Sequence, residues 1–242
     1  MHSRGTSAKS LIASCSEPFS GMPRRLKFLF VFVASLALGY ASMAAPVSHE
    51  PANLDLPKQE IRTYVESGQY DRDIAAVVAE TGVWLDQRAK QGGSHLAVVF
   101  DLDETLLSNW PFMADQDLGG SDAAWEAWMA RGKAPPIEPV RALYLRARKL
   151  GFDVYFLTTR KEHLRPATEQ NLRAIACGDY VALIMEPESW AGTGAAFKSA
   201  ERYRLSASGH VIIANIGDQK SDLAGGFAER TFKLPDPFYI TK

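Results

Sequence analysis

Two aspartates two positions apart, Asp101 and Asp103, are the residues of this sequence best suited to carry out a reaction. They follow directly on the apolar run "LAVVF" at residues 96–100, which is typical of a strand covered on both faces. Aspartate is a poor strand former, so the strand is expected to end where the acids begin. An aspartate fixed at a strand end can attack phosphorus as a nucleophile, and a second acid beside it can protonate the leaving oxygen and later activate water.

Further polar residues follow the other predicted strands. Thr158 and Thr159 come after one of them, Lys198 opens a helix after another, and "GDQKSD" carries Asp218 and Asp222 after a third. Phosphoryl transfer requires a cation and fixed hydrogen-bond donors that offset the charge of the transferred group. A threonine hydroxyl and a lysine ammonium suit phosphate oxygens, and two carboxylates are hard oxygen ligands suited to Mg²⁺. Together with the first two acids, this set is complete for Mg²⁺-dependent phosphoryl transfer through an aspartyl-phosphate.

The elements that would position these residues alternate between helix and strand. A helical pattern covers 58–90, followed by strand 96–100, helix 137–150, strand 152–158, helix 162–175, strand 180–185, helix 197–209, strand 210–217 and a short strand within 229–234. This alternation predicts an α/β fold with a doubly wound parallel sheet, preceded by an N-terminal helical segment. Ligands of such sheets bind beyond the carboxyl ends of the strands, where all the polar clusters would meet.

The segment between the first strand and the next helix, about 109–137, is too long for a plain connection. It contains "AWEAWMARG", which places Trp125, Trp128 and Met129 at helical spacing. We expect a small helical cap over the site. An apolar helix face packed on the body of the protein would explain the same tryptophans, and both roles can hold together.

The first 44 residues have the pattern of a secretory signal peptide. From Met22, which is an alternative start, "MPRRLK" carries three positive charges and precedes the apolar run "FLFVFVASLALGYA" and several small residues. This apolar run is short for a membrane span. We predict cleavage after Ala44, with an uncleaved anchor as the alternative and the arginine pair leaving twin-arginine export open. Residues 45–57 contain several prolines and lack apolar periodicity, which indicates a linker.

Composition narrows the class of protein. The 242 residues carry a net charge of −1, with 46% hydrophobic and 23% charged residues, which is ordinary for one globular domain. The dispersed lysines and arginines give no electrostatic footprint for a nucleic acid polymer. Of the two cysteines, Cys15 precedes the predicted cleavage point. Cys177 alone would remain, and we interpret it as a small buried hydrophobe rather than a nucleophile.

Other phosphoryl chemistries can be tested against the sequence. "GTGAAFKS" at 192–199 approaches a phosphate-binding loop, but Phe197 occupies the position of its second glycine, where a side chain would block close approach to phosphate. A cysteine phosphatase needs an arginine six residues after its cysteine, and Leu183 stands there. His95, His163 and His210 lack the spacing of metal ligands, which excludes a binuclear histidine-ligated phosphatase.

Four segments, in order, resemble the motifs of the haloacid dehalogenase (HAD) superfamily: "DLDET", "FLTTR", "FKSAER" and "GDQKSDL". The longer stretches "FDLDETLLSN", "TEQNLRA", "FKSAERYRL", "GDQKSDLAGG" and "FKLPDPFYI" resemble the subfamily IIIB acid phosphatases of the plant vegetative-storage and bacterial secreted type. The similarity covers residues 58–242. It implies a HAD-like Rossmannoid fold with a small cap.

The resemblance also implies roles for single residues. Asp101 would be the nucleophile and a Mg²⁺ ligand, and Asp103 the general acid and base, giving the metal its backbone carbonyl. Asp218 would bind Mg²⁺ directly, and Asp222 would support it through water or by orienting Lys198. The phosphoryl group would be bound by Thr158, Thr159 and Lys198.

Four neighbouring positions need a separate interpretation. Thr105 would tie its loop by its hydroxyl, and Arg160 is open between a substrate contact and a surface ion pair. Two positions depart from the family: Thr159 stands where relatives often have glycine and would tighten the pocket. Lys220 stands where many have tryptophan and would alter the pocket rim.

The sequence thus predicts an exported, Mg²⁺-dependent acid phosphatase, periplasmic or secreted, with small phosphomonoesters as substrates and no lasting membrane anchor. One alternative is a phosphotransferase on the same scaffold, because water and an alcohol acceptor would meet the same aspartyl-phosphate. The other alternative is a non-catalytic storage or binding protein of the same fold, since some relatives of the plant type have lost the nucleophile. The presence of Asp101 favours an enzyme.

Overall fold

The computed structural model describes residues 51–241, so the predicted signal peptide and residues 45–50 of the predicted linker lie outside the described part. Helix α2 (Asp55–Glu66) begins inside that predicted linker. The helical pattern predicted over 58–90 is divided, because Gly68 has a φ of 71° and ends the first helix before α3 (Gln69–Gln91) begins. A left-handed φ costs glycine little, which is why the chain bends there.

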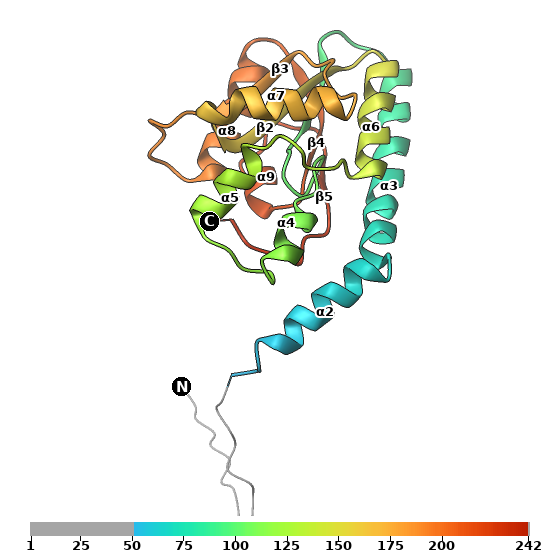
Figure 1. Ribbon diagram of the computed structural model, residues 1–242. Helices are drawn as coiled ribbons and strands as arrows, with labels where there is room; N and C mark the ends of the chain where they lie inside the picture. Colours follow the sequence, from blue (N-terminus) through green and yellow to red (C-terminus); the bar gives the residue numbers. More distant parts are fainter. Residues whose placement is uncertain (1–50, 242) are drawn as a thin grey trace, which may run out of the picture. The chain divides into compact units, whose positions relative to one another are not determined.

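Five parallel strands form one sheet in the order β3-β2-β1-β4-β5 (Figure 1). The strands are β1 (Leu96–Phe100), β2 (Asp153–Lys161), β3 (Ala182–Glu186), β4 (Val211–Gly217) and β5 (Thr231–Lys233). All five residues of β1 are buried, as expected for the central strand of a sheet covered on both faces. The chain runs from β1 outward to β3 and then returns to β4 on the other side of β1. The strand order therefore reverses beside β1, which is where such sheets bind ligands.

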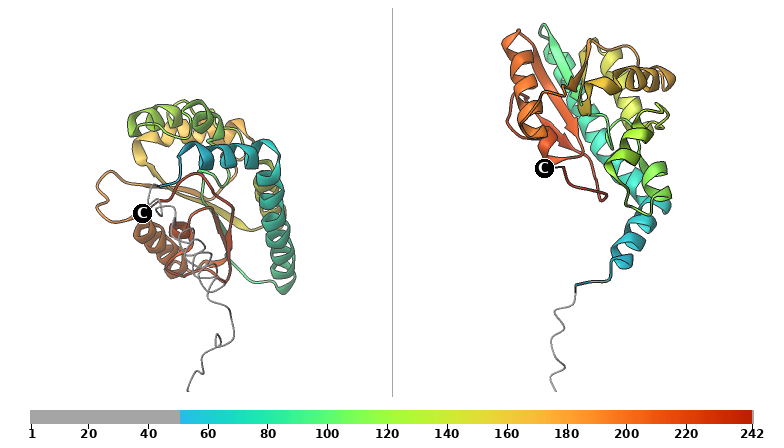
Figure 2. Two further views of the ribbon diagram at one scale, coloured as in Figure 1. Left: turned by 90° about the horizontal axis from the view of Figure 1, so that it is seen from below. Right: turned by 60° about the vertical axis from the view of Figure 1, so that its left-hand side comes forward.

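Helices cover both faces of the sheet. Helices α3, α6 (Glu138–Lys149) and α7 (Arg165–Ala174) bury their apolar side chains against one face, in a core that includes Val98, Phe100 and Phe156. Helix α8 (Gly194–Ala207) packs against the other face, where Phe197 meets Val99. The right-hand view of Figure 2 shows α8 and α3 on opposite sides of the strands. The predicted α/β doubly wound sheet is confirmed.

Several element boundaries differ from the prediction for local reasons. Strand β2 continues through Thr158 to Lys161, with a register shift against β3 beyond Thr158. The predicted helix 162–175 starts as the 3-10 turn η1 (Glu162–Leu164) and becomes α-helical only at α7. Helix α8 begins at Gly194, three residues early, because the Thr193 hydroxyl accepts a hydrogen bond from Ala196 N and caps the helix.

The long segment after β1 contains two short helices, α4 (Trp110–Asp115) and α5 (Asp122–Met129). Its two ends are held together at the base, where Ser108 N donates to Pro135 O and Ile137 N donates to Leu106 O. The side-chain amide of Asn171 on α7 exchanges two hydrogen bonds with the backbone of Ala134. These contacts hold α4 and α5 as an insert over the carboxyl end of β1.

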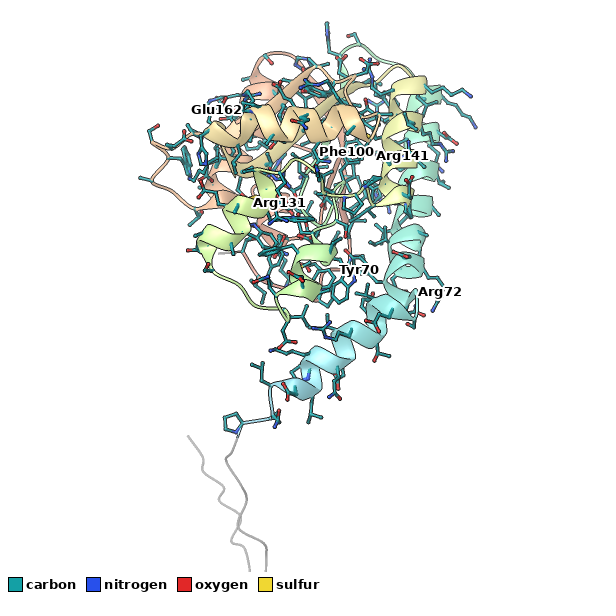
Figure 3. All side chains as sticks on the ribbon, in the orientation of Figure 1. Tyr70, Arg72, Phe100, Arg131, Arg141 and Glu162 are labelled. Atoms are coloured by element: carbon teal, nitrogen blue, oxygen red, sulfur yellow. The ribbon has the colours of Figure 1, made fainter. Side chains whose placement is uncertain are left out.

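The segment after β5 returns across the carboxyl ends of the strands. Leu234 N donates to Gly217 O at the end of β4 (2.9 Å). Farther along, the ring of Phe238 packs edge-on against Tyr70 (centroids 5.4 Å apart), which lies near the start of α3 and is labelled in Figure 3. The ring of Tyr239 meets Trp125 of α5 in the same manner (5.8 Å). This C-terminal segment therefore contacts the insert.

Two further properties follow from the fold. Cys177 is fully buried, as predicted, and burial raises the pKa of its thiol to about 12, so it is no nucleophile at neutral pH. Within residues 51–241, no helix combines the length and apolarity that a membrane crossing requires.

Candidate active site

The loop that follows β1 is tight and leaves its first aspartate at the strand end. Asp101 N still donates to Ile216 O of β4 (3.0 Å). The backbone then turns around Leu102, whose carbonyl accepts hydrogen bonds from Thr105, Leu106 and Leu107 N at 2.8–3.3 Å. Glu104 takes a left-handed φ of 52° within this turn. The turn thus points both Asp101 and Asp103 toward the carboxyl edge of the sheet, where both line one small cavity.

Lys198 of α8 contacts two acids, Asp101 directly after β1 and Asp222 in the short helix α9 (Lys220–Leu223) that follows β4. Its Nζ lies 2.5 Å from Asp101 Oδ1 and 2.6 Å from Asp222 Oδ1, and all three side chains are at least 92% buried. The other oxygen of Asp222 accepts from Gln219 N (2.8 Å). Both oxygens of Asp222 are therefore engaged within the protein, which agrees with the predicted alternative that it orients Lys198.

The charges of this cluster do not balance. Burial raises the pKa of Asp101 to about 7, even though the neighbouring Lys198 ammonium acts to lower it. Burial, followed by the charges of Asp101 and Asp222, also raises the pKa of Asp218 well above its ordinary value. Burial alone would lower the pKa of Lys198, but the two carboxylates outweigh it and raise that pKa. Three acids thus share one ammonium, and their mutual repulsion favours protonation of some of them; a bound cation would take the place of those protons.

The donor set suits a hard cation. Carboxylate oxygens of Asp101, Asp218 and Asp222 all lie within 4.8 Å of one another, and the three residues are buried. Asp218 is held in place by the hydroxyl of Thr105 (2.9 Å) and the side-chain amide of Gln219 (2.8 Å). Converging carboxylates without histidine or cysteine favour an ion such as Mg²⁺ over a soft transition metal.

Both carboxylate oxygens of Asp103 accept hydrogen bonds from Arg160 of β2. The guanidinium donates from Nη2 to Oδ1 (2.6 Å) and from Nε to Oδ2 (2.9 Å), and the arginine is 3% exposed. Burial alone would raise the pKa of Asp103, but the charge and hydrogen bonds of Arg160 outweigh it and lower that pKa. Of the two predicted roles for Arg160, the ion pair is present but does not lie at the surface, because the side chains of Arg160 and Asp103 are only 2% and 18% exposed.

The two threonines of β2 lie at different depths. Thr159 lines a small cavity of about 40 Å³ together with Asp101 and Lys198. Thr158 is 1% exposed, and its hydroxyl accepts from Arg160 N (3.1 Å). A Cβ at Gly194 would come within 2.9 Å of the Thr159 methyl, so the glycine lets the start of α8 approach this residue. The structure thus places Thr159, rather than Thr158, at the cavity surface.

A wider cleft of about 460 Å³ opens beside the small cavity. Asp103, Thr159 and Tyr239 line both spaces. Phe112 and Trp125 of the insert and Phe238 of the C-terminal segment contribute aromatic walls to the cleft. A phosphoryl group in the small cavity would leave its ester group in this cleft, with Asp103 between the two.

Sequence reasoning missed several polar residues around Asp103. Asn109 donates to Asp103 Oδ1 from its side-chain amide (2.8 Å), and Trp128 of α5 donates to Asn109 Oδ1 (2.8 Å). Glu104 is almost fully buried and accepts from Asn109 N (2.7 Å) and from the Tyr239 hydroxyl. The strings "LLSN" and "FYI" within the quoted motifs were the available signal, but neither string indicates a partner.

Comparison with known proteins agrees with this architecture. Residues 33–242 match the family described as HAD superfamily, subfamily IIIB (acid phosphatase). Acid phosphatase 1 of Solanum lycopersicum is 28% identical over 249 residues, covering 88% of this chain and 98% of the relative. Vegetative storage protein 1 of Arabidopsis thaliana is 32% identical, covering 77% and 73%. The solved class C acid phosphatase from Bacillus anthracis superposes with a TM-score of 0.64 at 21% identity, covering 77% and 87%, and shows the same fold.

The chain belongs to the HAD subfamily IIIB acid phosphatases, and it is a phosphomonoesterase of the hydrolase class. Enzymes of this superfamily generally use a divalent metal, and the buried acidic cluster at the end of β1 and β4 is a candidate site for one. Membership of this phosphatase family implies that the substrates of the protein are small-molecule phosphate esters.

Proposed function

We propose that this protein is an exported, Mg²⁺-dependent acid phosphatase that hydrolyses phosphomonoesters through an aspartyl-phosphate on Asp101. The observation that carries this proposal is the position of Asp101, which meets the ammonium of Lys198 at 2.5 Å and lines one cavity with Asp103. A nucleophile, a cationic donor and an acid thus line one small cavity, in which a phosphoryl group would lie.

Binding uses residues from four strand ends. Lys198 and Thr159 line the small cavity and donate to phosphoryl oxygens, while Thr158 supports the turn behind them. Asp101, Asp218 and the backbone carbonyl of Asp103 would hold Mg²⁺, with Asp222 in support by orienting Lys198. The bound ion supplies positive charge that offsets the phosphoryl oxygens as negative charge develops in the transition state.

The reaction proceeds in two displacements. The Asp101 carboxylate attacks phosphorus, the new O–P bond forms, and the ester P–O bond breaks as the leaving oxygen takes a proton from Asp103. Arg160 lowers the pKa of Asp103, so the protonated form of Asp103 is the minor one, and mild acid favours it. Asp103, now a carboxylate, takes a proton from water, which attacks the same phosphorus. This second step releases inorganic phosphate and restores both acids. The leaving alcohol occupies the aromatic cleft, whose walls suit flat or apolar groups.

A storage role is favoured by one specific observation, the 32% identity to a vegetative storage protein. Phosphotransfer to an alcohol is a second alternative, because an alcohol entering the open cleft would meet the same aspartyl-phosphate as water. Asp101 is present together with Lys198, Asp218 and Asp222, and this complete set favours catalysis over storage. We propose hydrolysis in mild acid as the main activity, in the periplasm or outside the cell.

The central test is a panel of phosphomonoesters assayed with mature protein, with and without Mg²⁺. We expect Mg²⁺-dependent release of phosphate, and a stable adduct of one phosphoryl group on Asp101 after rapid acid quench, detected by mass spectrometry. Asp101→Asn should show neither turnover nor adduct. Phosphate release by Asp101→Asn at the parent rate would overturn the mechanism, and an inert parent would favour storage. The intact mass of protein from its native host tests export, since the predicted mature chain starts near Ala45.

A further inference from the structure

We propose that Asn109 and Trp128 are positioning residues for Asp103. The indole N–H of Trp128, on cap helix α5, fixes the side-chain amide of Asn109, and this amide in turn fixes one carboxylate oxygen of Asp103. The inference rests on the proposed function, in which Asp103 passes a proton to the leaving group. It adds that helix α5 of the insert determines how the carboxyl group of Asp103 is oriented toward the leaving group.

Asn109 is fully buried and stands immediately before α4. Its Nδ2 donates to Asp103 Oδ1 (2.8 Å) and to Glu104 Oε2 (3.0 Å), which uses both amide hydrogens. Its Oδ1 accepts from Trp128 Nε1 (2.8 Å), and its backbone N–H donates to Glu104 Oε1 (2.7 Å). The side chain is therefore satisfied at both ends, and its oxygen meets a group that can only donate.

The indole determines which way the Asn109 amide faces. The two ends of an asparagine side chain have almost the same shape, so packing alone discriminates poorly between them. An indole N–H can only donate, and an ionised carboxylate can only accept, which is the state of Asp103 that Arg160 favours by lowering its pKa. If the amide were reversed, its oxygen would face the carboxylates of Asp103 and Glu104, and its NH₂ would face the indole N–H. Trp128 therefore selects the orientation that donates to Asp103.

This contact distinguishes the two oxygens of Asp103. Oδ1 accepts from both Arg160 Nη2 (2.6 Å) and Asn109 Nδ2 (2.8 Å), whereas Oδ2 has Arg160 Nε (2.9 Å) as its close donor. Oδ2 is thus the oxygen with coordination to spare for the leaving group. Arg160 approaches from β2 and Asn109 from the insert. Without the Asn109 contact, a carboxylate held from one side only could rotate.

Trp128 acts at a distance from the substrate. Neither Trp128 nor Asn109 is among the residues that line the 460 Å³ cleft or the 40 Å³ cavity. The Trp128 ring stacks on Phe112 (centroids 5.9 Å apart, 23° between planes), and Arg131 covers it at 6.0 Å. A phenylalanine could keep these ring contacts but has no N–H. Trp128→Phe therefore removes the hydrogen bond while keeping an aromatic ring, and a second Trp→Phe variant can account for the smaller ring.

The test compares kcat/KM for nitrophenyl phosphate, whose leaving group needs no proton, with kcat/KM for an alkyl phosphate, whose leaving group does. General acid catalysis contributes about 10²–10⁴-fold in typical cases, so misplacing the acid in Trp128→Phe should lower the alkyl value about tenfold more than the aryl value. Trp84→Phe is the matched control, because the Trp84 indole donates at the same 2.8 Å to Ile213 O, far from Asp103. It should lower stability and leave the alkyl-to-aryl ratio unchanged.

A double-mutant cycle assigns the effect to Asp103. In an Asp103→Asn background, Trp128→Phe should no longer change the alkyl-to-aryl ratio, because the acid on which it acts is absent. An unchanged ratio in Trp128→Phe, while Asp103→Asn alone changes it, would overturn this inference and leave the proposed function intact. An equal change with and without the Asp103 carboxyl group would also overturn it. If Asp103→Asn alone leaves the ratio unchanged, the acid role itself is wrong.

Discussion

Lys198 and Asp222 form a buried ion pair, with Nζ and Oδ1 2.6 Å apart, that holds the ammonium against the Asp101 carboxylate. The lysine enters from α8 on one face of the sheet, and the two acids follow β1 and β4. In the proposed mechanism this ammonium would bind the phosphoryl group beside Asp101. The ion pair with Asp222 would then keep the ammonium at the cavity in the absence of substrate.

Replacing Lys198 by methionine should abolish turnover and destabilise the fold. Removal of one partner from a buried ion pair typically costs about 3–5 kcal/mol, because the remaining charge is left uncompensated. Urea unfolding monitored by circular dichroism measures this loss. Lys149→Met is the control, since Lys149 is exposed on α6 and has no ion-pair partner within residues 51–241. Equal stability of the two variants would show that the bridge contributes nothing.

Metal removal should abolish activity and lower the melting temperature. The carboxylates of Asp101, Asp218 and Asp222 repel one another, and the hydrogen-bonded Lys198 offsets only part of their charge. Excess chelator should therefore stop turnover, and Mg²⁺ should restore it. A ligand at about 100 times its Kd stabilises a fold by about 2.7 kcal/mol, which is measurable by calorimetry. Asp218→Asn should be inactive and should not gain stability with Mg²⁺. Full turnover in chelator would contradict the metal site.

Gly217→Ala should damage the site through Asp222. A Cβ at position 217 would lie 2.5 Å from Asp222 Cβ and 2.6 Å from its Oδ2, so Asp222 must shift away from Lys198. Overpacking of this kind costs about 1–3 kcal/mol, and we expect kcat to fall as well. Gly178→Ala is the control, because the Cβ there would approach the flexible Arg173 side chain most closely, at 3.2 Å, with the Arg173 Cα at an ordinary 3.8 Å. Parent-like kcat in Gly217→Ala would contradict the role given to Asp222.

His163 joins helix α5 of the insert to Glu188, which follows β3, through a contact that depends on pH. His163 Nδ1 lies 2.8 Å from Glu188, and Nε2 lies 2.9 Å from Glu126 of α5. Both ring nitrogens can donate only in the protonated ring. The hydrogen bonds with Glu188, followed by those with Glu126, raise the pKa of His163. The hydrogen bonds from His163 in turn lower the pKa of Glu188 to about 2.

The signs of these shifts define a pH window. The histidine contribution is complete below its unfolded pKa, about 6.5, and is lost as the pH rises through its higher folded pKa. The Glu188 contribution is present above its unfolded pKa, about 4.3, and is lost as the pH falls toward 2. The melting temperature of His163→Gln should therefore fall below that of the parent most at about pH 5–6 and converge with it in alkali. A gap independent of pH would contradict the contact.

The aromatic wall of the cleft should affect kcat/KM for aryl and alkyl phosphates differently. Trp125 lines the cleft and meets the rings of Phe112 and Tyr239 edge-on, at 5.0 and 5.8 Å. Trp125→Ala should lower kcat/KM more for aryl phosphates than for small alkyl phosphates, because only the former fill the space beside the indole. Equal losses for both classes, accompanied by a lower melting temperature, would show that the residue serves packing alone.

The sequence predicted the strands well where burial alone determines them. "LAVVF" is a continuous apolar run, and β1 has the predicted bounds because both its faces are covered. The end of β2 was placed too early, since residues 159–161 are polar and their strand conformation depends on pairing with β3, beyond a register shift. Local hydrophobicity contains no information about such a partner.

For the site, the order of motifs predicted which acids converge, and the structure places Asp101, Asp218 and Asp222 together. The residues that hold the Asp103 carboxyl group could not be predicted from the sequence. Of its two donors, Asn109 is six residues away but Arg160 is 57 away, and the nearby Tyr239–Glu104 contact spans 135 residues. No period or spacing connects such residues, so only the folded chain identifies them.

The C-terminal segment has a consequence for how the enzyme gains activity during folding. Its Tyr239 and Thr241 line the small cavity together with Asp101. The cavity is therefore complete only when the C-terminal segment has met the loop after β1. Contacts of such long sequence separation form late and slowly compared with helices. A chain emerging unfolded on the far side of a membrane would therefore acquire its secondary structure while still inert. Hydrolysis would begin once the C-terminal segment has docked beside Asp101, so the time at which product appears would report when this contact forms.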